Sequence, residues 1–95
     1  FTNKKSYALK VKGDSMIDAG INDGDWVIIE ESKKFYKSKV HVILIDNQDV
    51  TLKYIKEINS EEIKLVPANK LYKEITYPIE RISIQGYVVG QVRIY

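Results

Sequence analysis

Short runs of β-branched and aromatic residues, each ended by a turn, constrain the fold of this chain more than any other feature. Residues 6–12 alternate between apolar and polar side chains, as a half-buried strand does. Residues 40–45 and 50–58 flank the polar link at residues 46–49, which predicts a β-hairpin. No segment shows the 3.6-residue period of an amphipathic helix of ordinary length. We therefore predict an all-β fold with a strongly bent sheet or a partly open barrel.

The remaining segments add to the strand pattern. A near-continuous apolar run at residues 25–30 predicts a strand buried on both faces. Residues 77–95 are dense in Ile, Val and Tyr, and Gly86 and Gly90 within them predict bulges or bends. Residues 15–20 are expected to form one short helical turn. No interdomain linker or repeat interrupts the chain, so residues 1–95 are predicted to form a single domain.

Composition excludes several classes of function. The net charge of +2 comes from 15 basic and 13 acidic residues, a balance that does not predict a nucleic-acid-binding surface. The chain has no cysteine, which removes thiol catalysis and disulfides. His41 is the only histidine, so neither a zinc site nor another cofactor is expected. No apolar run approaches the roughly 20 residues of a membrane helix, and no signal segment is visible, so we expect a cytoplasmic protein without membrane contact.

Ser15 and Lys53 are the candidate catalytic residues. A serine hydroxyl is a weak nucleophile until a base takes its proton, and a lysine can act as that base when burial keeps its amine neutral. Ser15 follows a strand and the Gly13 break, where the amides of Asp14 and Ser15 can point at a developing oxyanion. In the strand at residues 50–58, Lys53 shares a face with β-branched neighbours that can half-bury it, and for a base we expect its side chain to be mostly buried. Taken singly, a serine beside Gly-Asp is most often a turn residue and a strand lysine is most often solvated.

Four segments, in order along the chain, carry a resemblance that joins these residues. Residues 11–16 read Val-Lys-Gly-Asp-Ser-Met, 18–25 read Asp-Ala-Gly-Ile-Asn-Asp-Gly-Asp, 50–55 read Val-Thr-Leu-Lys-Tyr-Ile and 84–90 read Ile-Gln-Gly-Tyr-Val-Val-Gly. Together they resemble the carboxy-terminal catalytic domain of the LexA-type repressors. That serine peptidase family also includes phage lambda-type repressors and the UmuD mutagenesis proteins. Type I signal peptidases share the chemistry and a similar Gly-Asp-Ser-Met motif.

The resemblance implies a set of roles and partners. By position, Ser15 is the nucleophile, Lys53 the general base, and the N–H groups of Asp14 and Ser15 the oxyanion hole. Met16 is expected to pack under the turn. The implied function is a self-cleaving and dimerising repressor domain that responds to DNA damage through RecA filaments. Operator DNA would be bound by an amino-terminal helix-turn-helix domain. A homodimer is expected to form near residues 82–92, where β-branched and aromatic side chains exceed what a small monomer needs to bury.

The chain also departs from the family pattern. Family members cleave themselves at an Ala-Gly or Cys-Gly bond upstream of the catalytic serine, and no such pair precedes Ser15. Ala19-Gly20 follows the nucleophile instead, and we interpret it as structural. His41 stands where the family has a small or aliphatic residue, and a core role is the simpler interpretation. Two alternatives therefore stay open: a prophage repressor, or a UmuD-like polymerase accessory domain that acts mainly as a dimerisation module.

Overall fold

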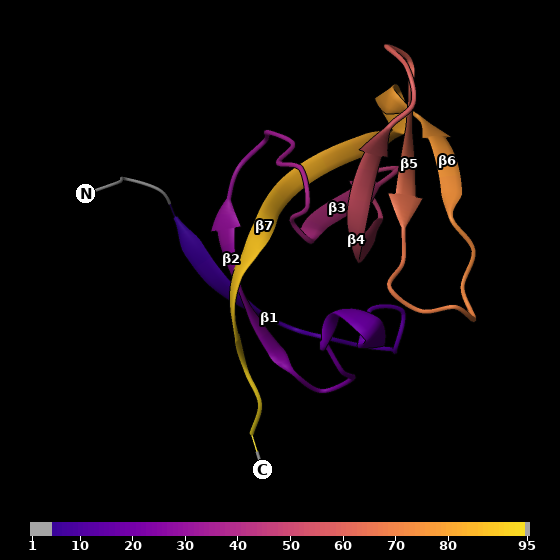
Figure 1. Ribbon diagram of the computed structural model, residues 1–95. Helices are drawn as coiled ribbons and strands as arrows, with labels where there is room; N and C mark the ends of the chain where they lie inside the picture. Colours follow the sequence, from indigo (N-terminus) through magenta and orange to yellow (C-terminus); the bar gives the residue numbers. More distant parts are fainter. Residues whose placement is uncertain (1–4, 95) are drawn as a thin grey trace.

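The computed structural model describes residues 5–94, which form one seven-stranded antiparallel sheet that does not close into a barrel. The strand order is β1-β2-β7-β3-β4-β5-β6. Figure 1 shows the long, curved β7 crossing between β1 and β2 on one side and β3 to β6 on the other. The prediction of an all-β, bent and open sheet is confirmed. The elements are β1 (Ser6–Lys10), a 3₁₀ turn η1 (Ile17–Ala19), β2 (Trp26–Glu31), β3 (His41–Ile45), β4 (Asp49–Glu57), β5 (Glu62–Val66), β6 (Ile75–Pro78), a 3₁₀ turn η2 (Ile79–Arg81) and β7 (Ile82–Val92).

Two irregularities bend β7, and both lie beside the glycines that predicted them. Against β2 the register shifts so that Val89, next to Gly90, is the additional residue. Against β3 the register shifts in the same way at Gln85, next to Gly86. An additional residue in one strand increases its local bend and twist, which lets β7 serve both halves of the sheet. Gly86 also permits close approach, because a Cβ atom there would lie 2.4 Å from the carbonyl oxygen of Glu30.

The bent sheet encloses two apolar clusters rather than one continuous core. The larger cluster packs beneath the segment that follows β1 and consists of Val11, Met16, Ile21, Val27, Ile29, Val42 and Leu52. The smaller consists of Ile43, Ile55, Ile63 and Leu65.

The expectation that the strand at residues 25–30 is buried on both faces is wrong for one face. Val27 and Ile29 are fully buried, whereas Trp26 and Ile28 are only partly buried, because β2 has no second layer over its outer face.

The hairpin of β3 and β4 sets the position of Lys53. Asp46 and Asn47 take positive φ angles of 54° and 57°, which Asp and Asn tolerate better than other non-glycine residues. The Gln48 N–H closes the turn on the carbonyl of Ile45 at 3.0 Å. This turn fixes the register in which Lys53 lies opposite His41.

A buried carboxylate ties the end of β7 to the loop before β2. Asp25 is 3% exposed and accepts hydrogen bonds of 2.9 Å from Nε and Nη2 of Arg93 and from the Gln91 side chain. The Arg93 guanidinium and the Asn22 N–H hold the pKa of the Asp25 carboxyl well below its usual range. The same arginine and glutamine donate to the carbonyl of Gly20. The loop that follows Ser15 is therefore fixed at its far end.

We predict that Asp25→Asn lowers the thermal stability of the domain in a pH-dependent way. A carboxyl whose pKa is lowered by folding contributes stability above its unfolded pKa of about 4, and that contribution is lost as the pH falls further. The difference in melting temperature between wild type and variant should therefore be largest near neutral pH and shrink below about pH 4. Asp49→Asn, at an exposed carboxylate, is the control. A difference that stays constant down to about pH 2 would contradict this assignment.

Candidate active site

The segment after β1 forms a tight loop that presents Ser15. Gly13 has a φ of 86°, a left-handed conformation that a residue with a side chain rarely adopts. Its N–H donates to the Asp23 carboxylate at 2.7 Å, which closes the base of the loop. Met16 is 2% exposed and packs into the larger apolar cluster under the turn, as predicted. A buried Met16 beside a partly buried Ser15 leaves the serine at the surface of a rigid support.

Lys53 reaches Ser15 from β4. Its Nζ donates a hydrogen bond to Ser15 Oγ at 3.1 Å, across 38 residues of sequence. A second hydrogen bond of 2.7 Å runs from the same nitrogen to Thr51 Oγ1, two residues earlier on the same face of the strand. Burial lowers the pKa of the Lys53 amine below its ordinary value. The side chain is partly buried, less than the mostly buried lysine that we expected.

Two backbone donors lie beside the serine hydroxyl. Within residues 5–94 no protein acceptor takes a hydrogen bond from the amides of Asp14 or Ser15. Both carbonyl groups accept hydrogen bonds. That of Asp14 accepts from Asn69 Nδ2 at 2.7 Å, and that of Ser15 accepts from the Ala68 N–H at 2.9 Å. The peptide groups around Ser15 are thus fixed through their oxygens, while their N–H groups stay unused by the protein.

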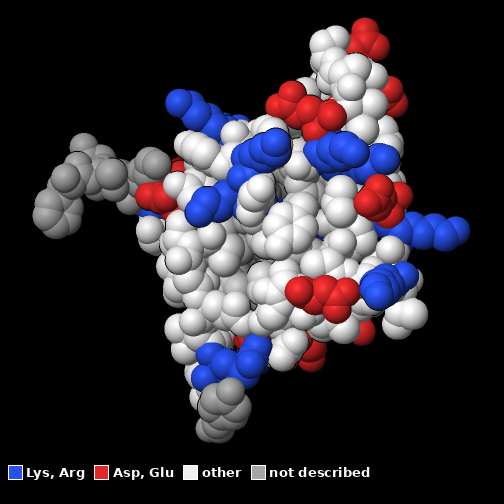
Figure 2. Space-filling view, in the orientation of Figure 1, with Lys and Arg blue, Asp and Glu red and all other residues white. Residues whose placement is uncertain are grey.

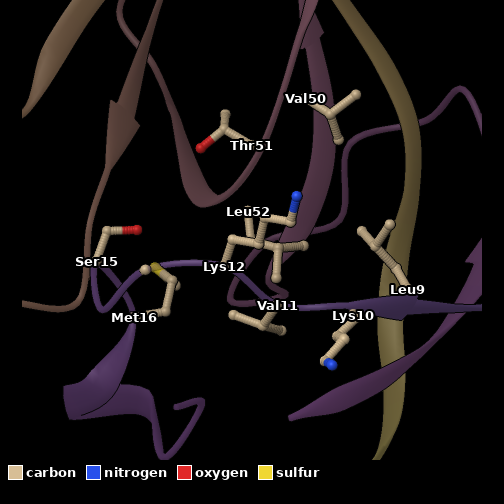
Figure 3. A pocket seen from close by; sticks show the side chains of 10 residues that line it. Leu9, Lys10, Val11, Lys12, Ser15, Met16, Val50, Thr51 and Leu52 are labelled. Atoms are coloured by element: carbon tan, nitrogen blue, oxygen red, sulfur yellow. The ribbon is translucent and has the colours of Figure 1, made fainter. Parts of the chain in front are cut away.

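A cleft of about 260 Å³ opens beside Ser15, between β1 with its following loop and β4. In Figure 3 the hydroxyl groups of Ser15 and Thr51 point toward each other across one end of the cleft. Its floor and walls are mixed in character and include Leu9, Val11, Met16, Val50 and Leu52 together with Lys10 and Lys12. Lys53 lines an adjoining hollow together with Thr51 and Tyr72. The lysine therefore approaches Ser15 from one side, and the cleft opens on another side of the serine.

Three residues near the site were not singled out from the sequence. Thr51 had a usable signal, because a residue two positions before Lys53 shares its strand face. Asn69 and Tyr72 had none. Both belong to the β5–β6 loop (residues 67–74), and Figure 1 shows this loop extending toward η1. The Tyr72 hydroxyl contacts the Asp14 carboxylate, which no local pattern predicts.

His41 lies in the core next to the lysine strand. It is fully buried, accepts the Tyr36 N–H on Nε2 at 3.1 Å, and packs beside the rings of Phe35 and Tyr87. Burial lowers the pKa of its imidazole. These contacts are those of a neutral core histidine. Among residues 5–94 no three potential ligands from His, Asp and Glu converge on one point as a metal site requires.

Residues 1–89 match the protein family described as Peptidase S24-like. The chain belongs to this peptidase family. It is 46% identical to the LexA repressor of Zymomonas mobilis over 94% of this chain and 41% of that protein. Its identity to the LexA repressor of Granulibacter bethesdensis is 43%, over 98% of this chain and 38% of that protein, and to that of Petrotoga mobilis 40%, over 97% and 45%. The chain spans about two fifths of the length of these curated relatives.

Family membership makes this a LexA-like domain of the serine peptidase type.

On the face shown in Figure 2, basic and acidic side chains are interspersed rather than gathered by sign. No helix within residues 5–94 is long and apolar enough to cross a bilayer.

We predict that the Lys53 amine titrates below the ordinary lysine value of 10.5, because its partial burial disfavours the charged form. The measurement is a pH titration of ¹³Cε-labelled lysines by NMR, with the Lys53 resonance assigned by its loss in Lys53→Arg. An inflection at or above 10.5 would show that burial does not lower the pKa of the Lys53 amine.

Proposed function

We propose that this domain is the self-cleaving peptidase domain of a LexA-like transcriptional repressor, with Ser15 as nucleophile and Lys53 as general base. The observation that carries the proposal is the 3.1 Å hydrogen bond between Lys53 Nζ and Ser15 Oγ. A serine needs a base to take its proton, and a neutral lysine can be that base, so the hydrogen bond joins two groups that can act only as a pair. The lowered pKa of Lys53 supports the neutral amine that the mechanism needs.

The reaction follows from these groups. Neutral Lys53 takes the proton of Ser15 as the oxygen attacks the scissile carbonyl carbon. The negative charge that develops on the carbonyl oxygen is stabilised by the amides of Asp14 and Ser15. The Lys53 ammonium then protonates the leaving amine, and an acyl ester on Ser15 remains. A water molecule, deprotonated by Lys53, hydrolyses the ester and restores both side chains. Thr51 keeps the lysine amine directed at Ser15 through its 2.7 Å contact.

The proposed substrate is an upstream peptide bond of the same polypeptide. Holding that bond in the cleft beside Ser15 makes the reaction effectively unimolecular. Ala19-Gly20 is a poor candidate for the bond. Gly20 has a φ of 81° and ends η1, and its carbonyl is held by Gln91 and Arg93. These contacts support the structural interpretation of that pair.

The proposed setting is a cytoplasmic repressor of the DNA-damage response. An activated RecA filament would stimulate cleavage, and operator DNA would be bound by an amino-terminal domain. The alternatives are a prophage repressor and a UmuD-like accessory domain. The residues encoded upstream distinguish them, because a helix-turn-helix favours a repressor, and an Ala-Gly or Cys-Gly pair favours self-cleavage.

We predict that the full-length polypeptide cleaves itself faster as the pH rises, because deprotonation of Lys53 activates Ser15. Ser15→Ala and Lys53→Ala should each reduce the first-order rate by at least about 100-fold while the fold persists. Gel analysis of the intact and cleaved chains over time gives the rate, and circular dichroism checks the fold. Lys56→Ala, at an exposed lysine of the same strand, is the matched control and should cleave at the wild-type rate. Retained cleavage in Lys53→Ala at alkaline pH would remove the lysine from the mechanism.

A homodimer is also part of the proposal, with its contact moved toward the end of β7. Gly86 and Tyr87 at the middle of the strand have neighbours on both sides, since β3 pairs with Ile82 to Tyr87 and β2 with Gly86 to Val92. These intramolecular partners account for part of the apolar density that first indicated a dimer. Beyond Tyr87, β7 lies against β2 alone, apart from a hydrogen bond from the Val88 N–H to Val40. Three side chains here are exposed and apolar: Val89 (51%), Val92 (48%) and Ile94 (74%).

We predict that sedimentation at micromolar concentration gives twice the monomer mass of 11.0 kDa. Val92→Lys should shift the equilibrium toward monomer, because it places a charge in the proposed contact. Val50→Lys is the matched control, since Val50 is a similarly exposed strand valine at 58%. A wild-type protein that stays monomeric would contradict the dimer without affecting the proposed chemistry.

A further inference from the structure

We propose that Asn69 is a positioning residue that aims the Ser15 amide at the oxyanion. The inference rests on the proposed function, because it assigns the Ser15 N–H to the oxyanion hole. Asn69 lies in the β5–β6 loop, more than fifty residues beyond the nucleophile in sequence, and its Nδ2 donates to the carbonyl of Asp14 at 2.7 Å.

The Asn69 side chain is held in one orientation. It is 7% exposed, and its Oδ1 accepts the N–H of Leu71 at 2.9 Å. With the oxygen occupied by a backbone donor, the NH₂ group must face the other way, toward Asp14. Both ends of the amide are therefore used, and rotation about its last torsion would break two hydrogen bonds at once.

The planar geometry of the peptide bond links this contact to the direction of the Ser15 N–H. The carbonyl of Asp14 and the N–H of Ser15 belong to one planar trans peptide, in which the two groups point in opposite directions. Fixing the oxygen therefore fixes the direction of the hydrogen. The other contact at this carbonyl is the Ile17 N–H at 3.4 Å, which is long for a hydrogen bond. Asn69 is thus the closer of the two donors.

The rest of the β5–β6 loop reinforces the same arrangement. The Ala68 N–H donates to the Ser15 carbonyl at 2.9 Å, and the Ala68 carbonyl accepts the Asp18 N–H at 2.7 Å. The Tyr72 hydroxyl contacts the Asp14 carboxylate. The loop holds the backbone around Ser15, whereas Lys53 contacts only its hydroxyl. Nucleophile activation and oxyanion stabilisation thus have separate structural supports.

This separation gives Asn69 a kinetic signature that a change at Lys53 does not share. Asn69→Ser removes the donor that faces the Asp14 carbonyl, because its hydroxyl is too short to reach Asp14, and it adds no charge. We expect first-order self-cleavage of the full-length polypeptide to slow about 10- to 100-fold, by analogy with the loss or misplacement of one oxyanion donor. The inflection of the pH–rate profile should stay at its wild-type position, because this neutral substitution adds no charge near Lys53. A uniform loss at every pH is the expected result.

The controls separate this inference from the proposed function. Asn47→Ser makes the same chemical change at an exposed turn and should cleave at the wild-type rate. NMR dispersion reports whether Asn69→Ser is folded, and Asn69→Leu, which is uncharged and of similar size, replaces it if it is not. A folded Asn69 variant that cleaves at the wild-type rate, or whose inflection moves, overturns the positioning role. Wild-type cleavage by Ser15→Ala overturns the proposed function, and this inference with it.

Discussion

The contact between Lys53 Nζ and Ser15 Oγ is the interaction on which the proposed chemistry depends, and the bend of the sheet makes it possible. The two groups belong to the loop after β1 and the strand β4, and three strands of the seven-stranded order lie between β1 and β4. A flat sheet would hold them apart. The bulges of β7 beside Gly86 and Gly90 bend the sheet until these segments meet, and Gly86 allows β2 to approach closely enough for that bend.

Partial burial of a lysine is unfavourable for folding and useful for chemistry. Desolvation disfavours the ammonium form, and no carboxylate is among the causes that shift its pKa. The partners of the amine are instead two hydroxyl groups, those of Ser15 and Thr51, which do not stabilise a positive charge as a carboxylate would. The loop that carries Ser15 is meanwhile held in three ways: by the burial of Met16 in the apolar core, by the β5–β6 loop, and by the pair of Asp25 and Arg93. A rigid loop and an amine biased toward neutrality are what a serine–lysine mechanism requires.

Local patterns were sufficient to predict β1 to β4, the hairpin, the bulges of β7 and the shared face of Thr51 and Lys53, because each depends on neighbours in sequence. They did not separate β6 (Ile75–Pro78) from the segment at residues 77–95. The order of the strands was not predictable in this way. β7 lies between β2 and β3, so the apolar side chains that indicated a partner chain are satisfied in part within the monomer. The role of Asn69 was also invisible, since an Asn in a loop is usually a turn residue and its contact with Asp14 exists only after the loop docks.

The pairing of Ser15 with Lys53 is tested most directly by the rate at which a fluorophosphonate modifies the domain, followed by mass spectrometry across a pH series. Such a reagent labels a serine in proportion to its activation by a neighbouring base. The account predicts one adduct, on Ser15, whose rate of formation rises through a single inflection below 10.5, and no adduct in Lys53→Ala. Labelling of Ser15 at the same rate in Lys53→Ala, or no labelling of Ser15 at any pH, would contradict it.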